Sequence, residues 1–422
     1  MNKMKGKDNV MKSLLVLMFL FSFQGIRAQI WPASTWSGAT NLTSVMNAVG
    51  VTDLSGLHFN PTNNRLYGVQ DDGRLRVLQW DLQTNLFSQI ANVSIGGGPE
   101  GVTQANLYAN EFYTIDENNY EIRRYVYSAN FSTVTEYKHW NLLLAPSIME
   151  DTGNTGPEGI VFIPDSFLSS IGFVSEQTGQ PYTSVKGLGG LFFVANQDQG
   201  NVWVFDVNPN ANNDFAFVGK YETNRTESCD LAFDRSTGLL YILHNISGNN
   251  RLEVTDLSTA SNGGMFKFTT LKDYLITNPF GNNDNIEGFA LTPKCPENGI
   301  TSAWLSRDVG TSEASSIKQD VLRWFSNFVA DGSCEILANN HYESAENFAV
   351  APNPVGNELR IHGSFDVNAT IQVFDSLGRI RLHKKAQSNF TDRIDVSNLS
   401  PGIYLISVQQ MGKNNIAKFL KE

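Results

Sequence analysis

The sequence predicts an all-β protein, built as a five- or six-bladed β-propeller followed by a small C-terminal β-sandwich. Short apolar runs alternate with clusters of Asn, Gly and Pro, which favour turns and make strands the expected element. One pattern of turns and strands recurs five times in the middle of the chain. After about residue 345 a separate series of alternating strands and turns has the pattern of a β-sandwich.

The size and composition of the chain fit this division into domains. A chain of 422 residues is long enough for two or three domains, and 41% hydrophobic residues can form a substantial core. The formal net charge is -11, and Lys and Arg do not cluster. Binding to phosphate backbones needs such clusters, so we expect no nucleic-acid partner and a surface that attracts cations.

The first residues have the features of an export signal. Lysines precede the apolar run 14–23, and a small-residue cleavage site ends at Ala28. We therefore predict a signal peptide over 1–28 and a mature chain beginning at Gln29, with Met11 as an alternative start. A membrane anchor is the weaker alternative, because the run is too short to span a bilayer, and we expect no transmembrane segment.

The repeated pattern consists of a small or acidic pair, an apolar strand, a turn, an aromatic-rich strand, a polar loop and a third strand. Its copies begin at residues 55, 100, 158, 230 and 287, and the longest interval contains an insertion near 165–190. Such spacing suits four-stranded propeller blades, in which radial stacking buries both faces of each small sheet. Segments such as the one around Ile90 supply the fourth strand. A sixth blade, closed by the segment after Gln29, stays an open alternative.

Three cysteines in an exported chain leave one unpaired. Cys295 and Cys334 flank the fifth repeat. The sequence leaves two alternatives for this pair: a disulfide between them, or two free thiols. Cys229 lies within a strand pattern and is predicted to be a buried thiol.

The repeat brings acidic residues to one end of the expected channel. The first strand of a blade lines the channel and the second runs antiparallel to it, so the start of the first and the end of the second share one face. The first set comprises Ser55, Glu100, Glu158, Asp230 and Glu287, and the second Asp71, Asp72, Asp116, Glu117, Asp198, His244 and Asp308.

Converging carboxylates repel one another unless they share a proton or bind a cation. We predict a metal bound by Glu100, Glu158, Asp230 and Glu287, and oxygen ligands favour calcium or magnesium over zinc. The alternative is that these acids accept hydrogen bonds from backbone N–H groups of neighbouring blades and lock the ring.

Several of the repeats resemble a known family. The segments LSGLHFNPTNNRLYGVQDDG, PEGV with YTIDENNYEIRRY, PEGIVF, CDLAFDRSTGLLYILHN and IEGFAL resemble, in this order, the bacterial SdiA-regulated family of exported calcium-associated β-propellers. The resemblance covers roughly residues 50–330, and its short motifs are shared with the esterase-like phytase family. It implies a calcium ion at Glu100, Glu158 and Glu287, where the Glu-Gly pair matches. Ser55 in place of an acid, and Leu231 in place of Gly, depart from the pattern.

The C-terminal residues carry a second resemblance. The segments FAVAPNPVGNELRI, IQVFDSLGRIRL and IDVSNLSPGIYLISVQQMGKNNIAKFLKE resemble the C-terminal sorting domain of the type IX (Por) secretion system. We therefore predict a propeller over 29–340, a linker over 341–347 and a sorting domain over 348–422. The resemblance implies that the type IX machinery is a partner, that the tail is removed, and that the protein reaches the surface or medium of a Gram-negative bacterium through the periplasm.

The sequence gives less information about catalysis. The GxSxG, HExxH, P-loop and CxxC signatures are absent. His244 and Asp116 are the candidate catalytic residues at the channel rim, although a structural role for His244, and for His58, is the more common one. Trp203, Trp304 and Trp324 are expected to pack between blades rather than to form a sugar platform.

Two functions stay open: a secreted binding protein with a calcium site and an unknown extracellular ligand, and a metal-assisted hydrolase of phosphoesters or lactones. A hydrolase of phosphoesters needs a basic group beside the metal, and Arg307 is the residue that the repeat places there. We favour the binding protein.

Overall fold

A computed structural model describes residues 29–46, 53–276, 285–295, 301–309, 313–334, 349–362, 369–375, 379–386, 391–410 and 413–422. The predicted signal peptide (1–28) and linker (341–347) lie outside these residues. The chain divides into two compact units, Met1–Cys334 and Glu335–Glu422. In the described residues, no helix is both long and apolar enough to cross a membrane.

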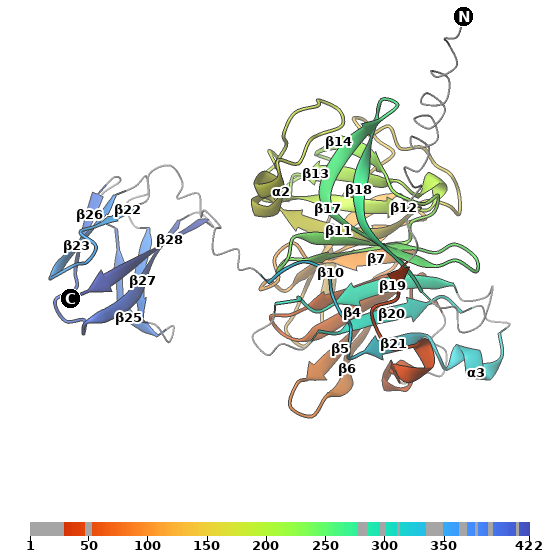
Figure 1. Cartoon of the computed structure of the whole chain (residues 1–422), viewed down its shortest axis with the longest axis horizontal. Helices are drawn as coiled ribbons and strands as arrows, with labels where there is room; N and C mark the ends of the chain where they lie inside the picture. The colour runs from red at the N-terminus through yellow and green to blue at the C-terminus, as the bar shows by residue number, and fades with distance from the viewer. Residues whose placement is uncertain are drawn as a thin grey trace, which may run out of the picture. The chain divides into compact units, whose positions relative to one another are not determined.

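The described residues of the first unit form five blades, of which the third and fourth are joined into one sheet; Figure 1 labels many of their strands. The first blade contains β3 (Leu57–Asn60), β4 (Arg65–Gln70), β5 (Arg74–Asp81) and β6 (Leu86–Ser94). The second contains β7 (Pro99–Thr103), β8 (Glu111–Asp116), β9 (Glu121–Tyr127) and β10 (Val134–Asn141). The third contains β11 (Pro157–Pro164), β12 (Gly190–Asn196), β13 (Val202–Val207) and β14 (Phe215–Glu222).

The last two blades are less regular. The fourth contains β15 (Asp230–Asp234), β16 (Leu239–His244), β17 (Arg251–Asn262) and β18 (Met265–Leu275), and β18 pairs in parallel with β14 at the outer edge of the third blade. The fifth contains β19 (Ile286–Leu291), β20 (Ala303–Arg307) and β21 (Leu322–Phe325), completed by β2 (Thr40–Asn41). The segment after Gln29 therefore closes the fifth blade, and β1 (Gln29–Ile30) pairs with β18, so it builds no sixth blade.

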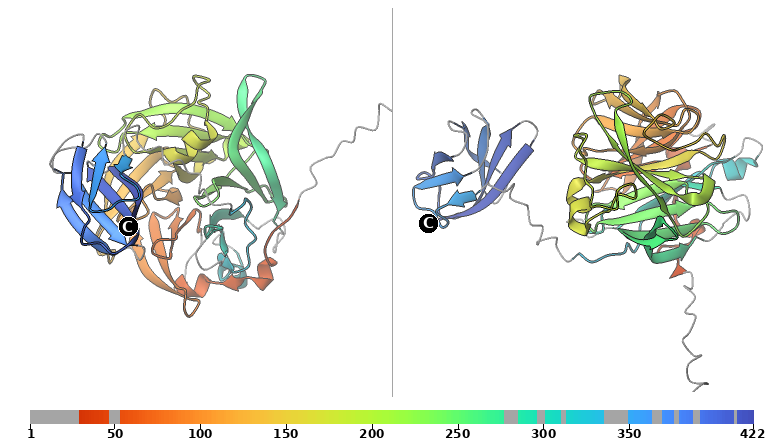
Figure 2. Two further views of the ribbon diagram at one scale, coloured as in Figure 1. Left: turned by 60° about the vertical axis from the view of Figure 1, so that its left-hand side comes forward. Right: turned by 90° about the horizontal axis from the view of Figure 1, so that it is seen from above.

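The inner strands form a closed ring, in which β3, β7, β11, β15 and β19 each contact the next and β19 contacts β3. Figure 2 (left) shows the blades following one another around a centre in chain order. A buried cluster fills each interface between neighbouring blades, and Phe59, for example, stacks on Trp304 of the fifth blade at 4.8 Å between ring centroids. Aromatic packing of this kind explains why a ring of small sheets is stable when a lone blade is not. The all-β propeller prediction is confirmed, with five blades.

The described residues also contain a few short helices and a disulfide. Helix α2 (Asp165–Ile171) lies in the predicted insertion of the third blade, and α3 (Ser315–Lys318) precedes β21. Of the two alternatives left open for Cys295 and Cys334, the structure has the disulfide, with a Cα–Cα distance of 5.6 Å. Cys229 is a free, buried thiol, as predicted.

The second unit is a β-sandwich, as predicted. One sheet contains β22 (Ala349–Ala351), β23 (Glu358–His362) and β26 (Thr391–Asp395). The other contains β25 (Ile380–Lys385), β24 (Thr370–Asp375), β27 (Gly402–Gln410) and β28 (Lys413–Lys421). The unit has its own core, which includes Ile361, Ile371, Ile406 and Phe419 at 0% exposure.

Candidate metal site at the channel mouth

The register of the blades brings the starts of the inner strands and the ends of the second strands to one channel mouth. Pro99 pairs with Asp116, and Ile286 pairs with Arg307, the residue before Asp308. Glu100 directly follows Pro99, and Glu287 directly follows Ile286. The expected face of the propeller therefore carries the predicted acids.

Three carboxylates form the tightest acidic group among the described residues. One oxygen each of Asp53, Glu287 and Asp308 lies within 4.8 Å of the other two, and all three side chains are half-buried. Carboxylate oxygens from separate chain segments at this spacing are the ligand type that calcium prefers. Of the four predicted ligands, this group contains Glu287.

Glu100 and Glu158 extend the group around the mouth. The main electrostatic neighbours of Glu100 are Asp53, Asp71 and Glu117. Those of Glu158 are other acids, including Glu100 and Glu117. The mouth is thus strongly anionic, which favours a bound cation or shared protons.

Burial and mutual repulsion weaken the acidity of this group. Burial, followed by the neighbouring carboxylates, raises the pKa of Asp53 to about 7. Burial raises the pKa of Glu100 to about 8, although a hydrogen bond from Ser55 opposes the rise. The pKa values of Glu158 and Glu287 lie well above their usual range for the same two reasons.

Neighbouring polar side chains orient the cluster. Asn285 Nδ2 donates to Asp308 Oδ2 at 2.8 Å, and its own Oδ1 accepts from Asn245 Nδ2 at 2.7 Å. Asp308 is therefore fixed by a chain of amides from the fourth and fifth blades.

Asp230 has a different role from the other predicted ligands. Its Oδ2 accepts hydrogen bonds from Leu57 N at 3.2 Å and Phe289 N at 2.8 Å, which belong to the first and fifth blades. Its Oδ1 accepts from Leu231 N at 2.8 Å. This arrangement matches the alternative in which an acid locks the ring, so Asp230 as a metal ligand stays a prediction that the geometry disfavours.

Glycines next to the acids allow the inner strands to approach closely. A Cβ at Gly101 would lie 2.7 Å from Ile160 N, and one at Gly56 would lie 2.4 Å from Glu100 O. The Glu-Gly pair of the repeat therefore combines a channel carboxylate with a residue small enough for backbone contact between blades. In the fourth blade Leu231 replaces this glycine.

His244 and Asp116 each bind neighbouring groups that lie outside the group of Asp53, Glu287 and Asp308. Both nitrogens of the fully buried His244 ring face oxygens: Nδ1 lies 2.8 Å from Glu227 O and Nε2 lies 3.0 Å from Glu253 Oε2. Asp116 accepts from Asn119 N at 2.9 Å and pairs with Arg123 at 3.2 Å. Neither is available to take a proton from a water at the mouth, so the geometry disfavours the predicted catalytic roles.

Arg307 is fully buried, and its charge lowers the pKa of Asp308 in part, against the larger effect of burial. Its Nη1 donates to Asp320 O at 3.0 Å, and its guanidinium carbon lies 5.9 Å from the Trp36 ring centroid. The basic residue that a phosphoester hydrolase would need beside the metal is therefore hydrogen-bonded to the backbone and lies over the Trp36 ring. The three predicted tryptophans belong to inter-blade clusters, as expected.

Sequence reasoning missed Asp53. The first repeat has Ser55 where the other copies have an acid, and Asp53, two residues earlier, contributes the carboxylate from this side of the ring. Ser55 Oγ lies 3.5 Å from Asp53 Oδ1. The absence of an acid at Ser55 was the sequence feature that could have directed attention to the nearby Asp53.

Comparisons with known proteins assign the second unit. Residues 349–422 match the secretion system C-terminal sorting domain. This domain directs export by the type IX secretion system, so the protein reaches the cell surface or the outside of the cell. The match confirms the predicted nature of the tail.

The comparison with solved structures gives a weaker similarity. A chain of the crystal structure of a nidogen/laminin complex is 14% identical, with a TM-score of 0.32, over 64% of this chain and 83% of that chain. A similarity at this level supports no assignment of fold or function. The propeller assignment therefore depends on the described blades themselves. The curated proteins gave no match. The resemblance of residues 50–330 to the SdiA-regulated family stays a prediction.

Proposed function

We propose that the protein is an exported binding protein whose propeller holds a calcium ion at the acidic channel mouth. The observation that carries this proposal is the spacing of Asp53, Glu287 and Asp308, whose oxygens lie within 4.8 Å of one another. Glu100 and Glu158 stand beside them as further ligands or as the surrounding negative charge. The resemblance to calcium-associated propellers points to the same ion.

The ion has a structural role in this proposal. Its ligands come from the segment before the first blade and from the fifth blade, so it joins the two ends of the ring. It also removes the repulsion among the acids, which otherwise need protons to coexist. The face around the mouth is the proposed surface for an extracellular ligand.

The alternative, a metal-assisted hydrolase of phosphoesters or lactones, has less support. Such an enzyme needs an accessible base and, for phosphoesters, a cation next to the metal. His244 is sealed between Glu227 and Glu253, and Arg307 packs on Trp36. Activity towards phosphoesters or lactones that depends on calcium would reverse this preference.

Calcium binding can be tested on the purified mature protein by calorimetric titration and by melting with calcium or a chelator. A ligand at a hundredfold excess over its Kd stabilises the folded state by about 2.7 kcal/mol. We expect a rise in melting temperature with calcium that is lost in Glu287→Gln and in Asp308→Asn.

The control is Asp81→Asn, at an exposed acid at the end of β5. It should keep the full response to calcium. A melting temperature that neither calcium nor chelator changes would disprove the metal site and leave shared protons as the way in which the acids coexist.

A further inference from the structure

A cavity lies in the channel at the end away from the acidic mouth. It has a volume of about 30 Å³ and is lined by residues of all five inner strands, and an adjoining cavity has about 40 Å³. The two cavities share His58, Phe59, Phe233, Arg235 and Leu291. One water needs about 10–15 Å³, so each cavity has room for two or three water-sized groups.

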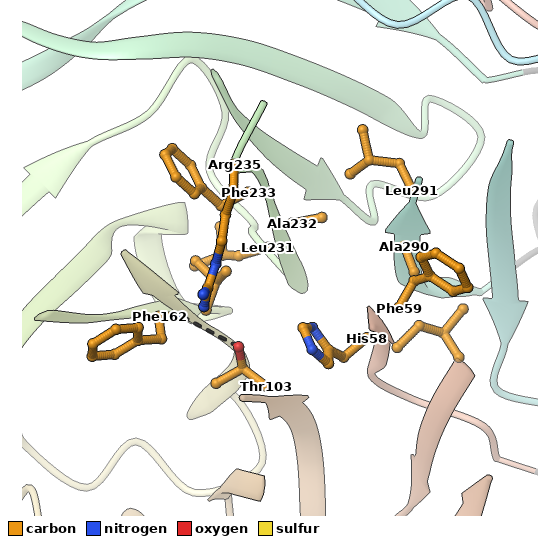
Figure 3. A pocket seen from close by; sticks show the side chains of 12 residues that line it. His58, Phe59, Thr103, Phe162, Leu231, Ala232, Phe233, Arg235, Ala290 and Leu291 are labelled. Atoms are coloured by element: carbon orange, nitrogen blue, oxygen red, sulfur yellow. Dashed lines mark hydrogen bonds between the residues drawn. The ribbon is translucent and has the colours of Figure 1, made fainter. Parts of the chain in front are cut away.

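Arg235 supplies a positive charge to this cavity. It follows β15, whose other end carries Asp230, and its side chain points into the cavity (Figure 3). Its Nη2 donates to Gln104 O at 2.8 Å and Ala105 O at 3.2 Å. The Nε–H and Nη1–H groups have no acceptor among the described residues, so one edge of the guanidinium is fixed and the rest can bind an anion.

His58 reaches the same space from β3, in the first blade. Its Nε2 is buried and has no hydrogen-bond partner among the described residues. Burial and the charge of Arg235 lower the pKa of His58 to about 3, although a hydrogen bond with the Gln104 side chain opposes the shift, so the ring is neutral. A buried polar nitrogen without a partner is uncommon and points to a group that completes it.

Thr103 offers a third donor. Its Oγ1 accepts a hydrogen bond from Phe162 N at 3.3 Å, shown as a dashed line in Figure 3, so its hydroxyl proton is available to a ligand. Arg235, His58 and Thr103 come from three different blades. The ring therefore assembles a polar site that no single blade contains.

The rest of the lining selects the ligand. Phe59, Phe233 and Leu291 give the cavities apolar walls. Asp234 brings a negative charge to the adjoining cavity, but Ser236 N donates to its Oδ1 at 2.8 Å and Lys294 N to its Oδ2 at 3.1 Å. One cation with neutral donors suits a single negative charge, and the walls suit a few carbon atoms.

We propose that this cavity is a binding site for a short-chain carboxylate, of the size of acetate or propionate. The carboxylate pairs with Arg235 and accepts hydrogen bonds from His58 and Thr103, and the alkyl group lies against the apolar walls. The site is separate from the acidic mouth and does not depend on a metal.

The test is ligand-observed saturation-transfer NMR on the mature full-length protein with acetate and propionate. Propionamide, which lacks the charge, is observed in the same way, and inorganic phosphate, which lacks the alkyl group and has no carbon-bound protons, is tested by its ability to displace propionate. We expect saturable binding of the carboxylates that weakens at least tenfold in Arg235→Gln, as expected for loss of a charged hydrogen-bonding partner.

His58→Leu provides a second variant in case Arg235→Gln does not fold, because it has a similar side-chain volume and removes the unpartnered nitrogen. It should also weaken binding, whereas Arg74→Gln at an exposed arginine and Glu287→Gln at the acidic mouth should not. The proposal is overturned by carboxylate signals that do not saturate, by equal binding of propionamide or phosphate, or by binding that both cavity variants retain.

Discussion

At the scale of single residues, equivalent acids of the repeat have acquired two roles. Glu287 joins the cluster at the mouth, whereas Asp230 accepts hydrogen bonds from the backbones of the first and fifth blades. Burial raises the pKa of Asp230 well above its usual range, and the three backbone donors offset part of this rise without a metal. The ring therefore has one blade whose acid holds its neighbours directly.

Asp230→Ala tests the direct role. It would leave the N–H groups of Leu57, Leu231 and Phe289 without their acceptor. We expect the free energy of unfolding to fall by at least about 2 kcal/mol, because unsatisfied buried donors are costly. Asp230→Asn, which keeps one acceptor oxygen, should lose less. Equal stability of both variants and the parent in denaturant titrations would show that these bonds contribute nothing.

The raised pKa values of Asp53 and Glu100, to about 7 and about 8, predict how stability depends on pH. Unfolded carboxyl groups titrate near pH 4, so between about pH 4 and pH 8 the folded protein binds protons that the unfolded chain has lost. Without calcium, these two groups therefore make stability fall as pH rises through this window.

Calcium competes with these protons, so its stabilising effect should be small at about pH 5.5 and large at about pH 8. Melting curves with calcium and with chelator across this range measure the difference. Asp308→Asn should remove the pH dependence of the calcium effect. A calcium effect that is constant across the range would contradict the proposed exchange of protons for the ion.

At the scale of the elements, the inner strands depend on glycine where neighbouring blades touch. Gly101→Ala would bring a Cβ to within 3 Å of three backbone atoms of β11, namely Ile160 N, Glu158 O and Gly159 Cα. We expect a loss of about 1–3 kcal/mol, the usual cost of overpacking. Gly38→Ala, whose nearest neighbour is at 3.4 Å, is the matched control and should change stability little.

The elements themselves were largely predictable from the sequence, because a blade is a local unit with its own turns. The starts at residues 100, 158, 230 and 287 fall within a residue of the start of β7, β11, β15 and β19. The chemistry of the site was less predictable. Asp53 lies before the first strand, and Arg235 and His58 face each other only because the ring is closed.

At the scale of the whole molecule, the ring is closed by several independent contacts. β2 completes the fifth blade, Asp230 links the fourth blade to the first and fifth, and the cluster of Asp53, Glu287 and Asp308 spans the junction. The disulfide between Cys295 and Cys334 constrains a segment of 39 residues, worth roughly 4 kcal/mol in the chain-entropy model. The closure of the ring therefore does not depend on a single contact.

The C-terminal sandwich has a core of its own, so it can be removed without exposing the core of the propeller. Deleting residues 349–422 should leave a folded propeller that still responds to calcium but is not exported, because the matched sorting domain is lost. Cell fractionation should find the truncated protein in the periplasm, resistant to protease, and absent from the surface and medium. The reciprocal control fuses residues 349–422 to a periplasmic reporter, which should then reach the surface. Unchanged surface or medium levels after the deletion would show that export depends on another part of the chain.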